Sequence, residues 1–173
     1  MVTTIDKKTS STQVTHLDEL AKDLLQVAIQ QTQIKMPPML KQEPLEVLFQ
    51  NTTFLDLFKY TLAEVLSVEL ANKDNAVQAV YLHDPDMNPD AASGFMPVDP
   101  CLHLLCVVEK SSAGFEAFIS AINHALTEEA RELPSPRYEK LAEILDVMII
   151  TAKDIEKRTG YALLLTSMHA PPL

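Results

Sequence analysis

Apolar residues recur every three or four positions in several stretches of the chain, a spacing typical of amphipathic helices. The first such helix is expected to begin at Thr15, a helix-capping residue, and to end before Pro37 and Pro38. In the last helix, Thr151 is the expected cap and Asp154 stands at the capping-box position. The same spacing predicts helices over residues 53–70, 113–132, 138–144 and 151–165.

Three shorter runs of Val, Ile, Leu and Tyr lie between these helices and are bounded by Asp, Asn, Pro and Gly, as buried strands are. They cover residues 77–83, 102–110 and 145–151. Strands interleaved with helices predict an α/β (α+β) fold. We expect a small mixed sheet of at least three strands covered by helices, with an N-terminal helical extension.

The pattern divides the chain into four parts. We expect a disordered polar tail over residues 1–14, an N-terminal helical segment over 15–70, an α/β domain over 71–168 and a tail over 169–173. Residues 45–50 match the recognition hexapeptide of picornaviral 3C proteases. The Gly-Pro that usually follows this hexapeptide is absent and the apolar pattern continues into the next helix, so we interpret it as native sequence rather than an engineered remnant.

Charge and composition narrow the classes of function. The formal net charge of −10 repels phosphate backbones and anionic lipid, which disfavours a protein that coats nucleic acid or binds membranes. No apolar stretch approaches the roughly 20 residues of a membrane span. The 2 cysteines form no disulfide framework, so reduced thiols in a cytoplasmic protein are expected. The 3 glycines do not form a phosphate-binding loop.

The segment between the first two predicted strands carries the densest set of acids and potential metal ligands. Cys101 and His103 are two positions apart on a predicted strand, so their side chains point to one side and would bind zinc together with His83. A histidine at a strand start is more often simply hydrogen-bonded. Asp84 and Asp86 begin an alternation similar to a calcium loop, but the Gly and closing Glu of that motif are absent, which favours a solvated acidic loop.

Residues 79–85, 100–109 and 145–151 resemble the three strand motifs of the minimal nucleotidyltransferase fold, which polymerase-beta-type and antitoxin-type nucleotidyltransferases share. In that family the first strand opens onto a Gly-Ser turn. The second strand carries an Asp-x-Asp pair, and the third supplies another Asp. The resemblance covers roughly residues 76–167.

The departures from this family are informative. Its Gly-Ser falls on Asp84 and Pro85, and its Asp-x-Asp falls on Cys101 and His103, so only Asp146 remains. The family's chemistry needs paired carboxylates to hold Mg²⁺, for which cysteine and histidine are poor ligands. The resemblance therefore implies a copy that has lost ordinary nucleotidyl transfer.

Three functions remain open. The first is a non-catalytic binding or regulatory protein built on a degenerate nucleotidyltransferase-like domain, without a cofactor. The second is an active, divergent nucleotidyltransferase that uses Mg²⁺. The third is a structural subunit that docks a larger assembly through its N-terminal helix. In the second case, the metal site would be rebuilt from Asp84, Asp86, Asp99 and Asp146.

The N-terminal helix carries an apolar stripe that another surface has to cover. It either folds back on its own sheet or docks a protein partner, and we expect docking, most simply as a homodimer. The reasons are the polar tail ahead of the helix and the rigid prolines behind it, together with anchor spacing typical of helix-in-groove binding. The anchors are Leu17, Leu20, Leu24 and Val27.

Overall fold

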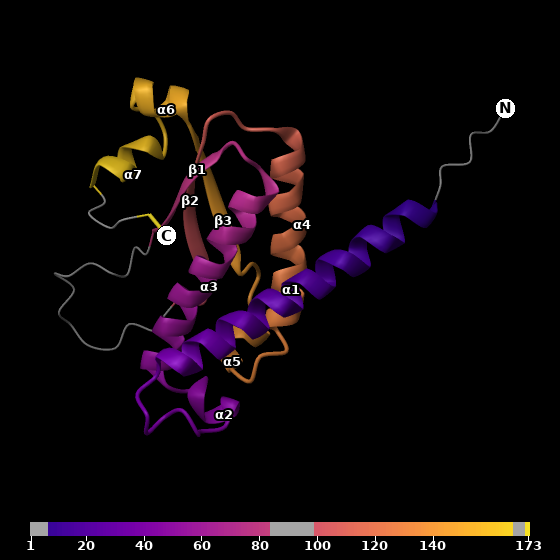
Figure 1. Cartoon of the computed structure of the whole chain (residues 1–173), viewed down its shortest axis with the longest axis vertical. Coiled ribbons are helices and arrows are strands. Elements are labelled where there is room, and N and C mark those ends of the chain that lie inside the picture. The colour runs from indigo at the N-terminus through magenta and orange to yellow at the C-terminus, as the bar shows by residue number, and fades with distance from the viewer. Residues whose placement is uncertain (1–6, 84–98, 168–171) are drawn as a thin grey trace.

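A three-stranded sheet lies at the centre of the molecule with helices on both of its faces (Figure 1). The computed structural model describes residues 7–83, 99–167 and 172–173. The predicted fold class, a small mixed sheet covered by helices with an N-terminal helix, is confirmed. In chain order the elements are α1 (Lys7–Lys35), α2 (Leu45–Leu48), α3 (Thr52–Lys73), β1 (Val77–Leu82), β2 (Leu102–Val108), α4 (Ala113–Ala130), α5 (Pro136–Glu139), β3 (Leu145–Thr151), α6 (Ala152–Lys157) and α7 (Ala162–Ser167).

The strand order is β1-β2-β3, with β2 in the middle. β1 and β2 are antiparallel, and β2 and β3 are parallel. The parallel pair is connected through α4, because two parallel strands need a long crossover. Its register places His103 of β2 beside Asp146 of β3.

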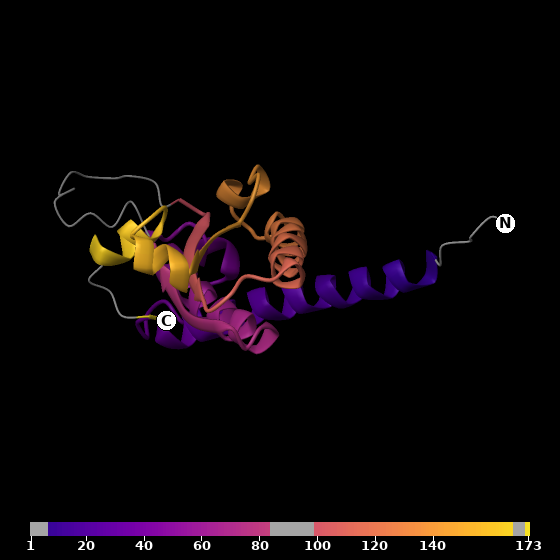
Figure 2. The same cartoon turned by 90° about the horizontal axis from the view of Figure 1, so that it is seen from above.

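The two faces of the sheet are covered differently. On the first face, Leu102, Leu104, Cys106 and Val108 of β2 join the main core, which also contains residues of α1, α3 and α4. On the second face, Leu105 and Val107 of β2 pack with residues of the short helix α7, and seen from above α6 and α7 lie on the other side of the strands from α4 (Figure 2). The buried members of the second cluster are Leu105, Val107, Ile150 and Ala162.

Helix α1 begins at Lys7, eight residues before the predicted Thr15, so the part of the expected tail from residue 7 to residue 14 is helical. No Pro or Gly interrupts the sequence between Lys7 and Lys35, and the Ser, Thr and Gln residues near its start cost only tenths of a kcal/mol each. The N-terminal end of α1 extends beyond the rest of the molecule in both views (Figures 1 and 2). Its C-terminal part packs against α3 and α4, so one continuous core joins the predicted segments 15–70 and 71–168.

The C-terminal helical region also differs from prediction. The expected single helix after Thr151 is two helices, because Arg158 and Gly160 adopt left-handed backbone conformations with φ of 52° and 56°. The Thr151–Asp154 capping box at its start is confirmed. The short helix expected over residues 138–144 is instead α5, which begins at Pro136, where a proline is favourable in the first turn.

An aromatic cluster fills the end of the main core nearest α2. The Phe49 ring meets the rings of Phe54, Phe58 and Tyr138 edge-on, with centroid separations of 5.1, 5.3 and 6.1 Å. Leu48 and Phe49 are fully buried, although they belong to the hexapeptide that matches the 3C protease site. Two residues of that hexapeptide therefore belong to the core.

Candidate functional site

A histidine between two carboxylates marks one end of the second face. His103 is the second residue of β2, and the parallel register brings Asp146 of β3 beside it. Its Nδ1 lies 3.1 Å from Oδ2 of Asp146, and its Nε2 lies 3.3 Å from Oδ2 of Asp99. Ionised carboxylates only accept hydrogen bonds, so both contacts are hydrogen bonds at once only when the imidazole carries both protons. We call Asp99, His103 and Asp146 the histidine–carboxylate cluster.

Asp99 is held in the cluster by its own hydrogen bonds. Burial raises the pKa of its carboxyl group, but the Cys101 N–H, the His103 side chain and the charge of Lys59 outweigh burial and leave the pKa below its usual range. The Cys101 N–H donates to Asp99 Oδ1 at 2.9 Å. The ionised carboxylate is therefore the favoured form next to His103.

The two cysteines are poorly suited to nucleophilic chemistry. Burial, together with the nearby Asp99 and Asp146 carboxylates, raises the pKa of the Cys101 thiol to about 11, and burial likewise raises that of Cys106 to about 11. Both thiols are protonated at neutral pH, whereas the thiolate is the reactive and metal-binding form.

The structure brings two of the three predicted zinc ligands, His83 and His103, opposite each other. The His83 N–H donates to the His103 carbonyl at 2.8 Å, so β1 and β2 bring these two residues opposite each other. By strand alternation His83, Cys101 and His103 belong to the same face. Among the described residues, however, no three His, Cys, Asp or Glu side chains come together in a way that could hold a metal ion.

Of the four carboxylates proposed to rebuild a magnesium site, two come together. Asp99 and Asp146 both contact His103, which lies between them. Asp84 and Asp86 lie outside the described residues.

The four predicted interaction residues of α1 are used largely inside the chain. Leu24 is buried in the main core, and Leu17 and Leu20 pack against it partly buried. Only Val27, at 38% exposure, is turned to the surface. Three of the four residues thus contact the chain's own core, and docking of a partner through this stripe remains a prediction.

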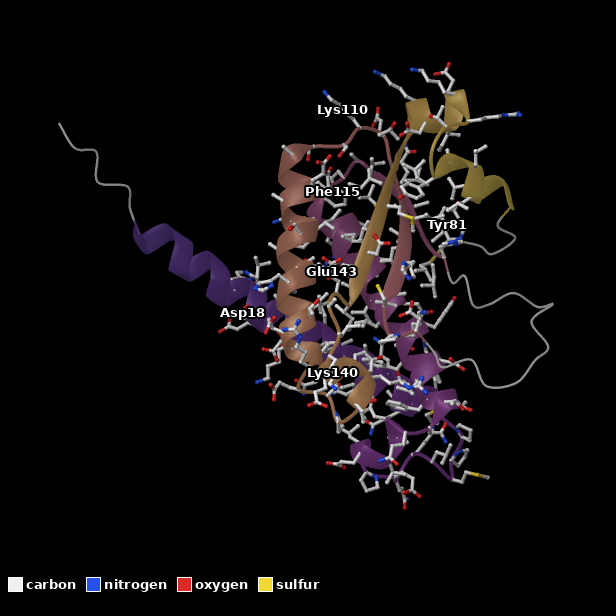
Figure 3. The ribbon with its side chains drawn as sticks, turned by 180° about the vertical axis from the view of Figure 1, so that it is seen from behind. Asp18, Tyr81, Lys110, Phe115, Lys140 and Glu143 are labelled. Atoms are coloured by element: carbon white, nitrogen blue, oxygen red, sulfur yellow. The ribbon has the colours of Figure 1, made fainter. Side chains whose placement is uncertain are left out.

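A groove between α4 and the outer edge of β3 lies next to the histidine–carboxylate cluster. Its volume is about 460 Å³, and Asp146 belongs to both features. The rim carries the carboxylates of Glu116 and Glu143, and the apolar lining comes mainly from β3 itself (Figure 3, in which Glu143 is labelled). The lining residues are Glu116, Ile119, Ser120, Asn123, Glu143, Leu145, Asp146, Val147, Met148, Ile149 and Tyr161.

The outer edge of β3 presents backbone groups to this groove. The Leu102 N–H donates to the Ile144 carbonyl at 2.8 Å, which places the even-numbered residues of this stretch in the ladder with β2. In a parallel ladder alternate residues bond to the same neighbour, so the backbone groups of Val147 and Ile149 point outward. An extended segment lying along β3 would pair with them.

Two side chains of α4 hold the start of β3. Thr127 Oγ1 accepts a hydrogen bond from the Ile144 N–H at 3.1 Å, and Asn123 Oδ1 accepts one from the Leu145 N–H at 3.1 Å. Both backbone donors precede or begin the strand and would otherwise lack an acceptor in the ladder. This clamp sets the position of β3 on α4 and hence the shape of the groove.

Sequence reasoning missed the groove residues Glu116, Glu143 and Tyr161. Glu116 lies on the polar side of a helix and Glu143 in the turn before β3, where charged residues are ordinary. The sequence of the third predicted strand did offer one indication of the groove. Its second residue, Asp146, is an aspartate although its neighbours are apolar. An exposed position in such a run indicates an edge strand.

No family model, curated protein or solved structure matches this chain. The resemblance to nucleotidyltransferases therefore remains a prediction. Among the described residues, no helix combines the length and apolar character needed to span a bilayer.

Proposed function

We propose that this chain is a non-catalytic binding protein that holds an extended, basic segment of a partner protein along the outer edge of β3. The observation that carries this proposal is the groove between α4 and β3, where outward-pointing backbone groups lie beside the carboxylates of Glu116, Glu143 and Asp146. Strand addition to a sheet edge draws its affinity from main-chain hydrogen bonds and its specificity from alternate side chains.

Charge complementarity favours a basic partner over a second copy of this chain. The net charge of −10 makes two copies repel each other, while lysine and arginine side chains on a bound strand would meet the acidic rim. The apolar lining, including Ile119 and Met148, suits apolar residues at the alternate positions. The partner segment is therefore expected to alternate basic and apolar residues.

The histidine–carboxylate cluster supports the non-catalytic part of the proposal. His103 occupies a position that the nucleotidyltransferase resemblance assigns to a metal-binding carboxylate, and it already lies between Asp99 and Asp146. When it carries both ring protons, this imidazole can donate one hydrogen bond to each carboxylate, a role in which a metal-binding carboxylate could not serve. We therefore interpret the domain as a degenerate relative of that fold whose former catalytic end now supports the binding edge.

A peptide titration tests the binding site. The probe is a fluorescently labelled heptapeptide that alternates lysine and valine, and a block peptide of identical composition controls for charge alone. We expect saturable binding of the alternating peptide, and at least about a tenfold loss, or 1.4 kcal/mol, when Glu116→Lys and Glu143→Lys are combined.

The matched control is the pair Glu19→Lys and Glu132→Lys, which changes net charge equally at exposed positions outside the groove. Equal weakening by both pairs, or equal binding of the two peptides, would show that the attraction is diffuse charge and not this groove. A probe N-methylated at alternate backbone positions should bind more weakly, since it loses donors to the β3 edge.

The enzymatic alternative has its own test. We expect no Mg²⁺-dependent transfer of labelled nucleotide to protein, RNA or small acceptors. Reproducible labelling that disappears in Asp146→Asn would support the divergent nucleotidyltransferase instead.

A further inference from the structure

The other edge of the sheet carries a contact that the proposed function does not use. The Leu173 N–H donates a hydrogen bond to the Val80 carbonyl at 2.9 Å, so the end of the described chain lies along β1 (Figure 1). The Leu173 side chain is partly buried and packs against the main core. Leu173 thus pairs with the outer edge of β1, although it lies more than 90 positions from Val80 in the sequence.

The hydrogen bonding of β1 explains why Val80 is available. The His83 N–H donates to the His103 carbonyl at 2.8 Å, which puts His83, Tyr81 and Ala79 in the ladder with β2. Alternation in an antiparallel pair then turns the backbone groups of Val80 and Leu82 outward. Leu173 satisfies one of these groups, the Val80 carbonyl.

A groove continues beside Leu173, between α3 and β1. Its volume is about 180 Å³. Val68, which is 60% exposed, forms part of its α3 wall. In contrast to the β3 groove, its lining contains no charged side chain: it consists of Ser67, Val68, Ala71, Val77, Gln78, Ala79, Val80 and Leu173.

We propose that the β1 edge is a second docking site, for an extended segment of a partner protein that carries an uncharged aliphatic residue, and that Leu173 occupies this site when the partner is absent. The chemistry of the occupant follows from Leu173 itself, which combines a backbone donor to Val80 with an aliphatic side chain in an uncharged groove. The site lies on the opposite edge of the sheet from the proposed basic-peptide groove, so either proposal can fail without the other.

Competition between the tethered leucine and an added peptide follows from this arrangement. A segment held in the same chain acts at an effective concentration on the order of millimolar. A free peptide must displace it, so its apparent affinity for the intact chain is lowered. Weakening the Leu173 contact should therefore increase the affinity of a peptide added in solution.

The probe is a labelled, C-terminally amidated hexapeptide with the sequence of residues 168–173, measured by fluorescence anisotropy. We expect it to bind Leu173→Asp and Leu173→Ser at least tenfold more tightly than the intact chain. A probe with aspartate in place of its final leucine should not bind. Two variants are used so that the result does not depend on the tolerance of the fold for one of them.

A block in the groove completes the test. Adding Val68→Glu to Leu173→Asp should abolish probe binding, whereas adding Val47→Glu, an exposed valine on α2 outside the groove, should leave it unchanged. Equal probe affinity for the intact chain and both Leu173 variants would overturn the proposal. Dimerisation of the Leu173 variants, measured by light scattering, would overturn it in favour of a second copy as the occupant.

Discussion

The two faces of the sheet differ in the length of the helices that cover them and in the side chains that they carry. The first face lies under α3 and α4, helices of 22 and 18 residues, with α1 packed across them. The second face packs against α7, which has 6 residues, and where β2 and β3 begin it carries His103 and Asp146 instead of apolar side chains. The comparison indicates that the first face provides most of the folding free energy, which leaves the second face and the strand edges free to carry polar groups.

Two adjacent leucines of β2 give the most direct test of this difference. Leu104 faces the main core and Leu105 the small cluster, and both are 0% exposed. We expect Leu104→Ala to cost about 4–5 kcal/mol of unfolding free energy and Leu105→Ala about 2–3, because a site under short helices collapses more readily around a lost side chain. Urea denaturation measures both values. Equal costs would contradict the asymmetry between the two faces.

A second pair, on α1, asks whether this helix belongs to the first face. Leu24 is buried in the main core, while Val27 is 38% exposed. Leu24→Ala should lower the free energy of unfolding by about 2–4 kcal/mol, and Val27→Ala by roughly 0.5 kcal/mol or less. The measurement is again urea denaturation, with light scattering to report the oligomeric state. A Leu24 variant with unchanged stability that also loses a dimer would restore the docking interpretation of this helix.

The clamp between α4 and β3 is expected to have a smaller effect. Thr127→Ala leaves the buried Ile144 N–H without its acceptor, which should cost about 1–3 kcal/mol. Thr127→Ser keeps the hydroxyl group and should recover most of this loss. If serine destabilises the protein as much as alanine does, the threonine methyl group and not the hydrogen bond is important.

The smallest expected effect concerns the polar end of the second face. The pKa of Asp99 is lower in the folded chain than its ordinary value of 3.8, so its contribution to stability is present above about pH 4 and is lost as the pH falls through the folded pKa. His103→Ala removes one hydrogen bond and one nearby charge, so it should raise the pKa of Asp99 towards 3.8. Carboxyl NMR titration measures the shift.

Asp154 provides an internal control for that titration. Its pKa is lowered by hydrogen bonds from the Thr151 side chain and backbone, far from His103 in the sequence. The Asp154 value should therefore stay unchanged in His103→Ala. If Asp99 does not respond either, its hydrogen bond from the Cys101 N–H and the charge of Lys59 account for the lowered pKa without His103.

Much of the fold could be predicted because its signals are local. The spacing of apolar residues reports helices and strands directly, and the Thr151–Asp154 capping box is confirmed residue by residue. The beginning of α1 was missed because polar helix formers such as those after Lys7 carry no apolar stripe. The break at Gly160 was missed because one glycine in a helical pattern is tolerated in many helices.

The candidate site was predictable only in part, since it depends on pairing between distant segments. Sequence spacing places Cys101 and His103 on one side of a strand, but only the β2–β3 register brings Asp146 to His103. The sequence also could not tell which surface covers the apolar stripe of α1. An amphipathic helix has the same pattern of residues whether it packs on its own chain or on a partner. The burial of Leu24 shows that this residue of the stripe is covered by the chain itself.

The packing of α1 on α4 has a consequence for the synthesis of the protein. Helix α4 begins at Ala113, 78 residues after α1 ends at Lys35. At a translation rate of about 5–20 residues per second, roughly 4–16 s pass before α4, the second helix that packs on α1, begins to be made. During that interval α3 can already pack on α1, but the part of α1 that α4 will cover is available to chaperones. The nascent chain is therefore expected to be most vulnerable to aggregation before α4 emerges.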